Sequence, residues 1–146
     1  MKEVNKNPIP QGKYIPAVRH ADVIYTSGMT PRKDGVLLYS GEIKASVPVD
    51  AYREAVELAT LNAMGAALNC LELNEKIASV LQMNIFLNTE AGFTAHSKIA
   101  DFASEIVIDV LGIKSIGSRA AIGVASLPSN ASVEITLVCS VNKVFK

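Results

Sequence analysis

Residues 118–141 read SRAAIGVASLPSNASVEITLVCSV and contain two apolar segments joined by a polar turn. Each segment carries one charged residue, Arg119 at the start of the first and Glu134 inside the second. The linker at 126–130 holds a proline, which fixes φ, and an asparagine, which tolerates left-handed geometry, so it predicts a hairpin-like or crossover return. The odd positions from Val133 to Val141 are apolar. They predict a strand with one buried face and place Glu134 on the other face.

Three further segments are predicted strands because they are rich in β-branched residues or alternate in polarity: 14–18, 23–27 and 80–87. In the third of these segments the odd positions alternate with the even ones, as in a strand with one buried face: Leu81, Met83, Ile85 and Leu87. A turn is predicted over 19–22, and Asp34-Gly35 is typical of a tight hairpin turn.

Two segments have apolar residues every three or four positions, which is the spacing of a helix with one apolar face: 50–71 and 94–111. Asp50 is the expected N-cap of the first helix, and Gly112 is expected to end the second. The order of the elements predicts a single α+β domain over residues 1–146, with both helices on one face of the sheet.

Composition excludes several classes of protein. The 146 residues suffice for one domain with its own core. With 14 basic and 14 acidic residues the net charge is zero, which argues against a dedicated nucleic-acid binder. No apolar run approaches the roughly 18 residues of a membrane span, and the first residues do not resemble a signal peptide. Cys70 and Cys139 lie in apolar patterns without metal spacing, as expected of reduced thiols in a cytoplasmic protein that holds no metal.

Arg119 and Glu134 are the main candidates for substrate binding and catalysis in this sequence. The planar guanidinium of Arg119 suits bidentate binding of a carboxylate, although an ion pair at a strand end, with Glu134 as one partner, explains its position at least as well. Glu134 can act as a general base or orient a water if it is partly desolvated. An exposed strand carboxylate is the simpler interpretation of Glu134 taken alone.

The other candidates are individually weaker. The hydroxyl of Tyr14 can hydrogen-bond a ligand, and the backbone at Ser27-Gly28 can approach one closely, but packing and the end of a strand explain them equally well. His96 is kept as a pocket candidate near the start of the second helix. The sequence contains no phosphate-binding loop, dinucleotide fingerprint or nucleophile elbow.

These residues, in this order, resemble the Rid or YjgF-type proteins, also called the L-PSP endoribonuclease family. The resemblance extends over nearly the whole chain and is carried by Tyr14, Thr26-Ser27-Gly28, Arg119, Leu127-Pro128 and Val133-Glu134-Ile135. The segments Ala-Ser-Leu-Pro and Ala-Ser-Val-Glu-Ile are most similar to those of a less characterised branch of that family.

The resemblance implies a chorismate-mutase-like fold with a mixed sheet, a homotrimer, and clefts between subunits that bind small carboxylate-bearing metabolites. It also implies hydrolysis of reactive 2-imino acids and enamines to 2-keto acids and ammonia without a cofactor. By this resemblance Arg119 would bind the substrate carboxylate and Glu134 would activate or position the attacking water. Tyr14, Ser27 and Gly28 would line the pocket.

The chain also departs from the family pattern. Ala121 stands where the active branch has a cysteine, Met29 stands where it has a glutamine, and its pocket asparagine falls near His96 or Ser97. These departures motivate a second hypothesis, a non-catalytic protein that binds or senses small carboxylates in the same clefts. Ribonuclease activity is suggested only by the family's older name, and the zero net charge and lack of a basic, aromatic stripe argue against it.

Overall fold

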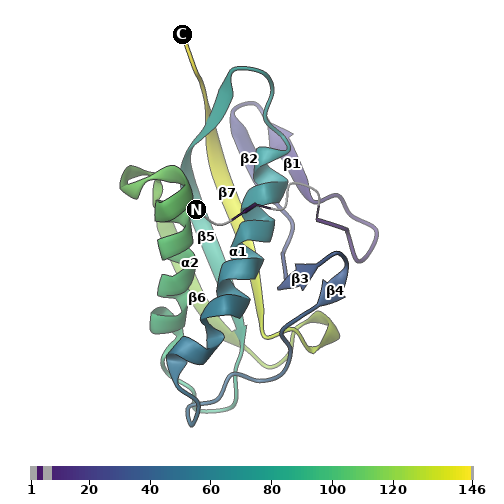
Figure 1. Cartoon of the computed structure of the whole chain (residues 1–146), viewed down its shortest axis with the longest axis vertical. Coiled ribbons are helices and arrows are strands. Elements are labelled where there is room, and N and C mark those ends of the chain that lie inside the picture. Colours follow the sequence, from purple (N-terminus) through teal and green to yellow (C-terminus); the bar gives the residue numbers. More distant parts are fainter. Residues whose placement is uncertain (1–2, 5–7, 146) are drawn as a thin grey trace.

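The computed structural model describes residues 3–4 and 8–145, and its main feature is a five-stranded mixed sheet with two helices on one face (Figure 1). The strands of this sheet are β1 (Ala17–His20), β2 (Val23–Thr26), β5 (Glu75–Asn88), β6 (Ser118–Val124) and β7 (Val133–Lys143). A separate hairpin contains β3 (Arg32–Lys33) and β4 (Val36–Leu37), and the helices are α1 (Arg53–Leu68) and α2 (His96–Leu111). Single turns of 3-10 helix occupy Val49–Tyr52, Ile113–Ser115 and Pro128–Asn130. The predicted α+β fold with both helices on one face is confirmed.

The strand order is β1-β2-β7-β5-β6, so the last two strands of the chain lie on opposite sides of β5. β6 runs parallel to β5, whereas β7 runs antiparallel to it. The predicted return is therefore a crossover past the end of β5 and not a hairpin. Its turn uses the left-handed geometry expected there, with φ of 57° at Ser129 and 60° at Asn130.

The alternation predicted for β7 is confirmed. The face of β7 that packs beneath the helices is apolar and at most 5% exposed, and it consists of Val133, Ile135, Leu137, Cys139 and Val141. Glu134 is half-buried and lies on the opposite face. Because side chains alternate along a strand, burial of the apolar face fixes the face on which Glu134 is presented.

β5 is longer than predicted and contains register shifts between Ile77 and Ser79 and between Val80 and Gln82. Such bulges change which residues point to each face of a sheet. Val80 is consequently buried and Leu81 is 44% exposed, so the prediction that Leu81 belongs to the buried face is wrong. Beyond the bulge the predicted face holds, with Met83, Ile85 and Leu87 buried.

Several predicted boundaries are wrong and two turn signals are confirmed. The first strand begins at Ala17 and not at Tyr14. Asp50 does not cap α1, because a 3-10 turn precedes the helix and the Asp50 carboxylate instead accepts a hydrogen bond from Arg53 Nε at 3.1 Å. The turn predicted at 19–22 is shorter, since its first two residues belong to β1. Asp34-Gly35 forms the β3–β4 turn with positive φ at both positions, and Gly112 ends α2 with φ of 99°.

The predicted domain, 1–146, includes residues 1–2, 5–7 and 146, which lie outside the described ranges. Within those ranges no helix is long and apolar enough to cross a membrane.

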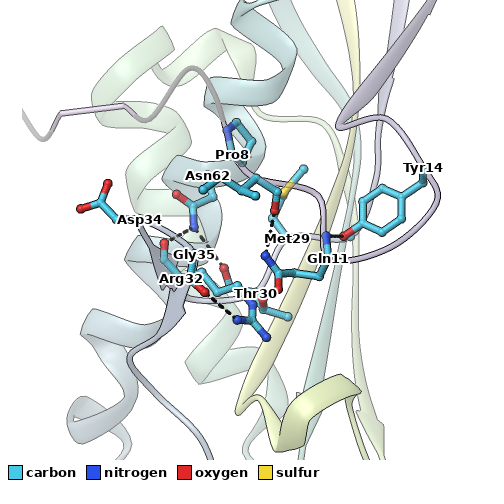
Figure 2. A pocket seen from close by; sticks show the side chains of 11 residues that line it. Pro8, Gln11, Tyr14, Met29, Thr30, Arg32, Asp34, Gly35 and Asn62 are labelled. Carbon is cyan, nitrogen blue, oxygen red and sulfur yellow. Dashed lines mark hydrogen bonds between the residues drawn. The ribbon is translucent and has the colours of Figure 1, made fainter.

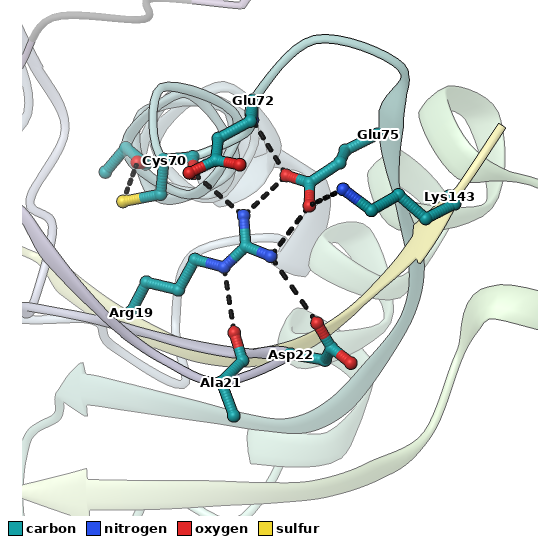
Figure 3. A network of polar contacts seen from close by, with 8 residues as sticks. Arg19, Ala21, Asp22, Cys70, Glu72, Glu75 and Lys143 are labelled. Atoms are coloured by element: carbon teal, nitrogen blue, oxygen red, sulfur yellow. Dashed lines mark hydrogen bonds and ion pairs between the residues drawn. The ribbon is translucent and has the colours of Figure 1, made fainter.

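An ion-pair network joins the edge strand β1 to the start of β5 (Figure 3). Arg19 donates to both carboxylate oxygens of Glu75, with Nη2 at 2.8 Å from Oε1, and Arg19 Nη1 also donates to the Cys70 carbonyl. The Glu75 side chain is 2% exposed and accepts further from the Glu72 N–H, while Lys143 Nζ lies 3.3 Å from Oε1. The hydrogen bonds from Arg19 and then Glu72 lower the pKa of Glu75 to about 2.

We expect Glu75→Gln to destabilise the protein at neutral pH and to matter progressively less in acid. The folded-state pKa of about 2 lies below the ordinary value of 4.5, so the stabilisation by ionised Glu75 is full above 4.5 and is lost as the pH falls towards 2. Urea unfolding of wild type and variant across pH 2–7 measures this difference. Asp22→Asn is the matched control, because Asp22 is 81% exposed and lies 3.5 Å from the same arginine. A difference independent of pH would contradict the prediction.

Candidate functional site

Glu134 lies in a groove with a volume of about 460 Å³. The groove is formed by the N-terminal loop, the segment that follows β2 and the turn before β7, and its lining residues are Gln11, Tyr14, Ser27, Gly28, Thr30, Arg32, Pro128, Ser129 and Glu134. The structure thus brings Tyr14, Ser27 and Gly28 together with Glu134, although more than 100 residues separate them in the sequence.

The Glu134 carboxylate lies directly against the backbone of Gly28. A Cβ atom added to Gly28 would be 2.6 Å from Glu134 Cδ and 2.8 Å from Oε2, distances at which a side chain cannot be accommodated without a shift. Met29 fixes this approach, since its N–H donates to the Ile135 carbonyl at 2.8 Å and its carbonyl accepts from the Ile135 N–H at 2.9 Å. Glycine at position 28 is therefore required by close packing.

Burial raises the pKa of Glu134 above its ordinary value of 4.5. The described residues place no basic group within 4 Å of the carboxylate, so desolvation is not offset by an ion pair inside one chain. A carboxylate with a raised pKa exchanges a proton more readily near neutral pH than an exposed one does. Glu134 is therefore suited to serve as a general base.

Hydrogen bonds hold the N-terminal loop beside the groove. Ser27 Oγ donates to the Ile15 carbonyl at 2.6 Å, and the Gln11 N–H donates to the Tyr14 hydroxyl at 3.0 Å. The hydroxyl proton of Ser27 is thus already engaged in a hydrogen bond within the protein. The Tyr14 hydroxyl has accepted a bond and keeps its proton for donation to a ligand.

Arg119 lies on the other face of the sheet, against α2. Its guanidinium donates to Asp101 Oδ1 at 2.7 Å, to Ser97 Oγ at 2.8 Å and to Ser104 Oγ at 2.9 Å. The ion pair considered from the sequence exists, but its partner is Asp101 and not Glu134. Within one chain the structure does not bring Arg119 and Glu134 together.

The remaining candidates gather on the Arg119 side. Ala121 pairs in register with Ile85 and is half-buried, two positions beyond Arg119 on β6. His96 begins α2, packs edge-to-face on Phe93 at 5.2 Å, and lines a second groove with Gly123. A Cβ added to Gly123 would lie 2.5 Å from His96 Nε2. Arg119, Ala121, His96 and Ser97 therefore form one set, separate from the set around Glu134.

Sequence reasoning missed other residues of the Glu134 groove, chiefly Gln11, Thr30, Arg32 and Ser129. The available signal was local: Thr30 and Arg32 flank Pro31, which lies three residues after Gly28. In the described part of the chain no three His, Cys, Asp or Glu side chains are grouped so as to hold a metal ion.

Comparison with known families covers nearly the whole chain: residues 4–141 match the model of the family described as endoribonuclease L-PSP. The chain belongs to this family. Protein TCP17 of Trypanosoma cruzi is 31% identical over 138 residues, covering 91% of this chain and 84% of that protein.

Comparison with solved structures supports the same family fold. The Agrobacterium tumefaciens protein Atu1372, of unknown function, is 31% identical with a TM-score of 0.81, covering 95% of this chain and 86% of that one. E. coli TdcF with bound serine is 19% identical with a TM-score of 0.67, covering 94% and 95%, and shows the fold alone. The YjgF-type fold expected from the sequence is confirmed.

Met29, one departure from the family pattern, is 7% exposed and packs in the core of this L-PSP family member. Met29 does not line the Glu134 groove, although it lines a smaller cavity beside it.

We expect Gly28→Ala to displace the Glu134 carboxylate and to lower stability by about 1–3 kcal/mol, the usual cost of overpacking. Adding Glu134→Ala should remove most of this cost, because the new methyl group then occupies the space of the lost carboxylate. Urea unfolding of the two single variants and the double variant measures the coupling between the positions. Additive effects would show that Gly28 and Glu134 are not packed as described.

Proposed function

We propose that this protein hydrolyses reactive 2-imino acids and enamines to 2-keto acids and ammonia in a cleft between subunits. The observation that carries this proposal is the half-buried Glu134, whose pKa is raised by burial, in a groove with the Tyr14 hydroxyl. The family shown for the chain supports a small-molecule site, and the serine bound to the similar TdcF supports a ligand derived from an amino acid.

The second half of the cleft comes from a neighbouring copy in this proposal. Arg119 and Glu134 lie on opposite faces of one sheet, so Arg119 can complete the Glu134 groove only when another chain supplies it. Such head-to-tail contacts close into rings, and we propose the homotrimer that the family resemblance implies.

The sheet face without helices offers the surface for this contact (Figure 1). It carries several exposed apolar side chains, among them Val18, Tyr25 and Ile122, which are 52%, 46% and 39% exposed. Val18 is in register with Tyr25, and Tyr25 with Val138, which places them on the face of β7 that bears Glu134. An apolar face of this kind supports association between subunits.

The chemistry needs orientation, a water and a route that carries both protons of this water to nitrogen. Arg119 binds the substrate carboxylate, and the electrophilic imine carbon faces a water beside Glu134. Glu134 takes a proton from this water as its oxygen bonds to the carbon, which gives a carbinolamine. The C=N π pair moves to nitrogen in this addition, and Glu134 returns the proton there to complete the neutral carbinolamine. Glu134 then takes the proton of the carbinolamine hydroxyl as the C=O bond of the keto acid forms, and passes it to the amino nitrogen as the C–N bond breaks and ammonia leaves. Tyr14 is placed to donate a hydrogen bond, and no cofactor is required.

A non-catalytic carboxylate-binding protein is the second candidate function, and the observation that favours it is Ala121, which has no reactive side chain near Arg119. Ligand-induced stabilisation without turnover would support this alternative. Ribonuclease activity has less support, because the net charge is zero. The free thiols Cys70 and Cys139 support a cytoplasmic location for either function.

We expect ammonia and keto-acid release from 2-iminopropionate, generated in place, to exceed the buffer rate measured at the same pH. The rate should fall in acid as Glu134 becomes protonated, with a midpoint above 4.5 because burial raises the pKa of this residue. Glu134→Gln should remove this pH dependence and lower kcat/KM by about 10²- to 10⁴-fold. Asp109→Asn, on the exposed side of α2, is the control. A buffer-level rate with folded wild-type protein would contradict catalysis and favour the binding function.

Mixing inactive variants tests the shared cleft. We expect Arg119→Ala to lower kcat/KM by about 10- to 150-fold, the effect of losing a charge-assisted hydrogen bond of about 1.5–3 kcal/mol. Unfolding and refolding an equal mixture of Arg119→Ala and Glu134→Ala chains should restore about a quarter of the wild-type activity. Random trimers place intact Arg119 and intact Glu134 in the same cleft about one time in four. If both residues acted within one subunit, mixing would restore nothing.

A further inference from the structure

Arg32 differs from the other arginines of this chain in having no carboxylate partner in the part of the chain that the structure describes. Arg19, Arg53 and Arg119 each form an ion pair with an acidic side chain. No acidic group of the described residues lies within 4 Å of the Arg32 guanidinium, although this side chain is only partly exposed. A partly buried arginine without a counter-ion is an attractive site for an anion.

The protein holds Arg32 in a fixed position (Figure 2). Asn62 Nδ2 donates to the Arg32 carbonyl at 2.8 Å and to the Thr30 carbonyl at 3.1 Å, which ties this segment to α1. Arg32 Nη1 donates to the Gly35 carbonyl at 3.0 Å and so orients the guanidinium. These hydrogen bonds from Asn62 Nδ2 and Arg32 Nη1 are made within the protein, so they hold Arg32 in place without a ligand.

One edge of the guanidinium remains unused. Arg32 Nε is buried and has no acceptor among the described residues, which also supply no hydrogen bond to Nη2. These two N–H groups point in the same direction and match the two oxygens of a carboxylate. A buried donor without an acceptor is destabilising, so a ligand that supplies oxygen atoms gains from this edge.

Arg32 lies where two cavities adjoin. It lines the Glu134 groove and also a smaller cavity of about 70 Å³, and the two cavities share Gln11, Tyr14, Gly28, Thr30 and Arg32. Asp34 lines the smaller cavity and Glu134 lines the groove, but neither forms an ion pair with Arg32. Asn62 Oδ1, a second buried atom without a partner, belongs to a residue of the smaller cavity and can bind a water there.

We propose that Arg32 binds a second carboxylate of the ligand, so that the groove prefers dicarboxylic 2-imino and 2-oxo acids. This inference rests on the proposed function, in which Arg119 of a neighbouring subunit binds the first carboxylate. Arg32 is then a residue that determines specificity at the far end of the ligand. Glu134 does not neutralise it, since no carboxylate oxygen of Glu134 lies within 4 Å of the Arg32 guanidinium.

The test compares 2-oxoglutarate with 2-oxopentanoate, which has a methyl group in place of the second carboxylate. Isothermal titration of the wild-type oligomer should give a Kd about tenfold or more lower for 2-oxoglutarate. Arg32→Gln should abolish this preference while changing the Kd for 2-oxopentanoate by less than about threefold. Lys33→Gln, which removes the exposed neighbouring charge, should retain the preference. Arg32→Lys should retain part of it, because the charge remains and the bidentate edge is lost.

Equal wild-type affinities for the two acids would overturn the role of Arg32, and so would a preference that persists in Arg32→Gln. The outcome is separable from that of the proposed function. Turnover of 2-iminopropionate without a dicarboxylate preference would leave hydrolysis standing and remove the Arg32 site. A preference that depends on Arg32, without turnover of any imine, would leave the site standing and remove hydrolysis.

Discussion

The pairing of β7 with β2 on one side and β5 on the other is the constraint on which the rest of this structure depends. The helix-facing side chains of β7 are almost fully buried, so a shift of one residue in its register would turn the core outwards. The same register places the Glu134 side chain on the opposite face of β7. It also aligns the Ile135 backbone for its hydrogen bonds with Met29, which bring Gly28 against the Glu134 carboxylate. Stability of the core and position of the acid are thus consequences of one strand alignment.

The fold places Arg119 and Glu134 in different electrostatic environments. Arg119 is orientated before any ligand binds, because Asp101 and two serines of α2 hold its guanidinium. Glu134 is desolvated, and no basic group of the described residues lies within 4 Å of its carboxylate. In the proposed assembly, subunit contact would complete the cleft by bringing the oriented arginine of one chain to the desolvated carboxylate of its neighbour.

The sequence predicted those features that depend on short-range rules. Alternation in β7, the Asp34-Gly35 turn and the glycine that ends α2 each follow from local backbone geometry. Leu81 was misassigned because a bulge interrupts the alternation of β5, and nothing in the local pattern marks the bulge. Asp50 was misassigned because a polar residue before a helix can bind a nearby arginine instead of the helix N–H groups.

The candidate site was less accessible to such rules. Spacing alone could not show that Tyr14, Ser27 and Gly28 lie beside Glu134, because the strand order β2-β7 that unites them is a property of the whole sheet. Arg32 was missed because an arginine beside a hairpin turn has the appearance of an ordinary surface charge. Its significance depends on the tertiary structure, in which no described carboxylate lies within 4 Å of the guanidinium.

The positions at which this chain departs from the family pattern further limit the reactions that the site can catalyse. Ala121 has no nucleophile, so a covalent intermediate cannot form at that position, and Met29 is used for packing in the core. The groups that remain beside the groove are the carboxylate of Glu134, the hydroxyl of Tyr14 and the cationic edge of Arg32. A carboxylate beside a hydroxyl can activate water, and a cation can hold an anionic substrate. Water is therefore the nucleophile that this site can best employ, and a substrate that is already electrophilic is the one that it can best convert.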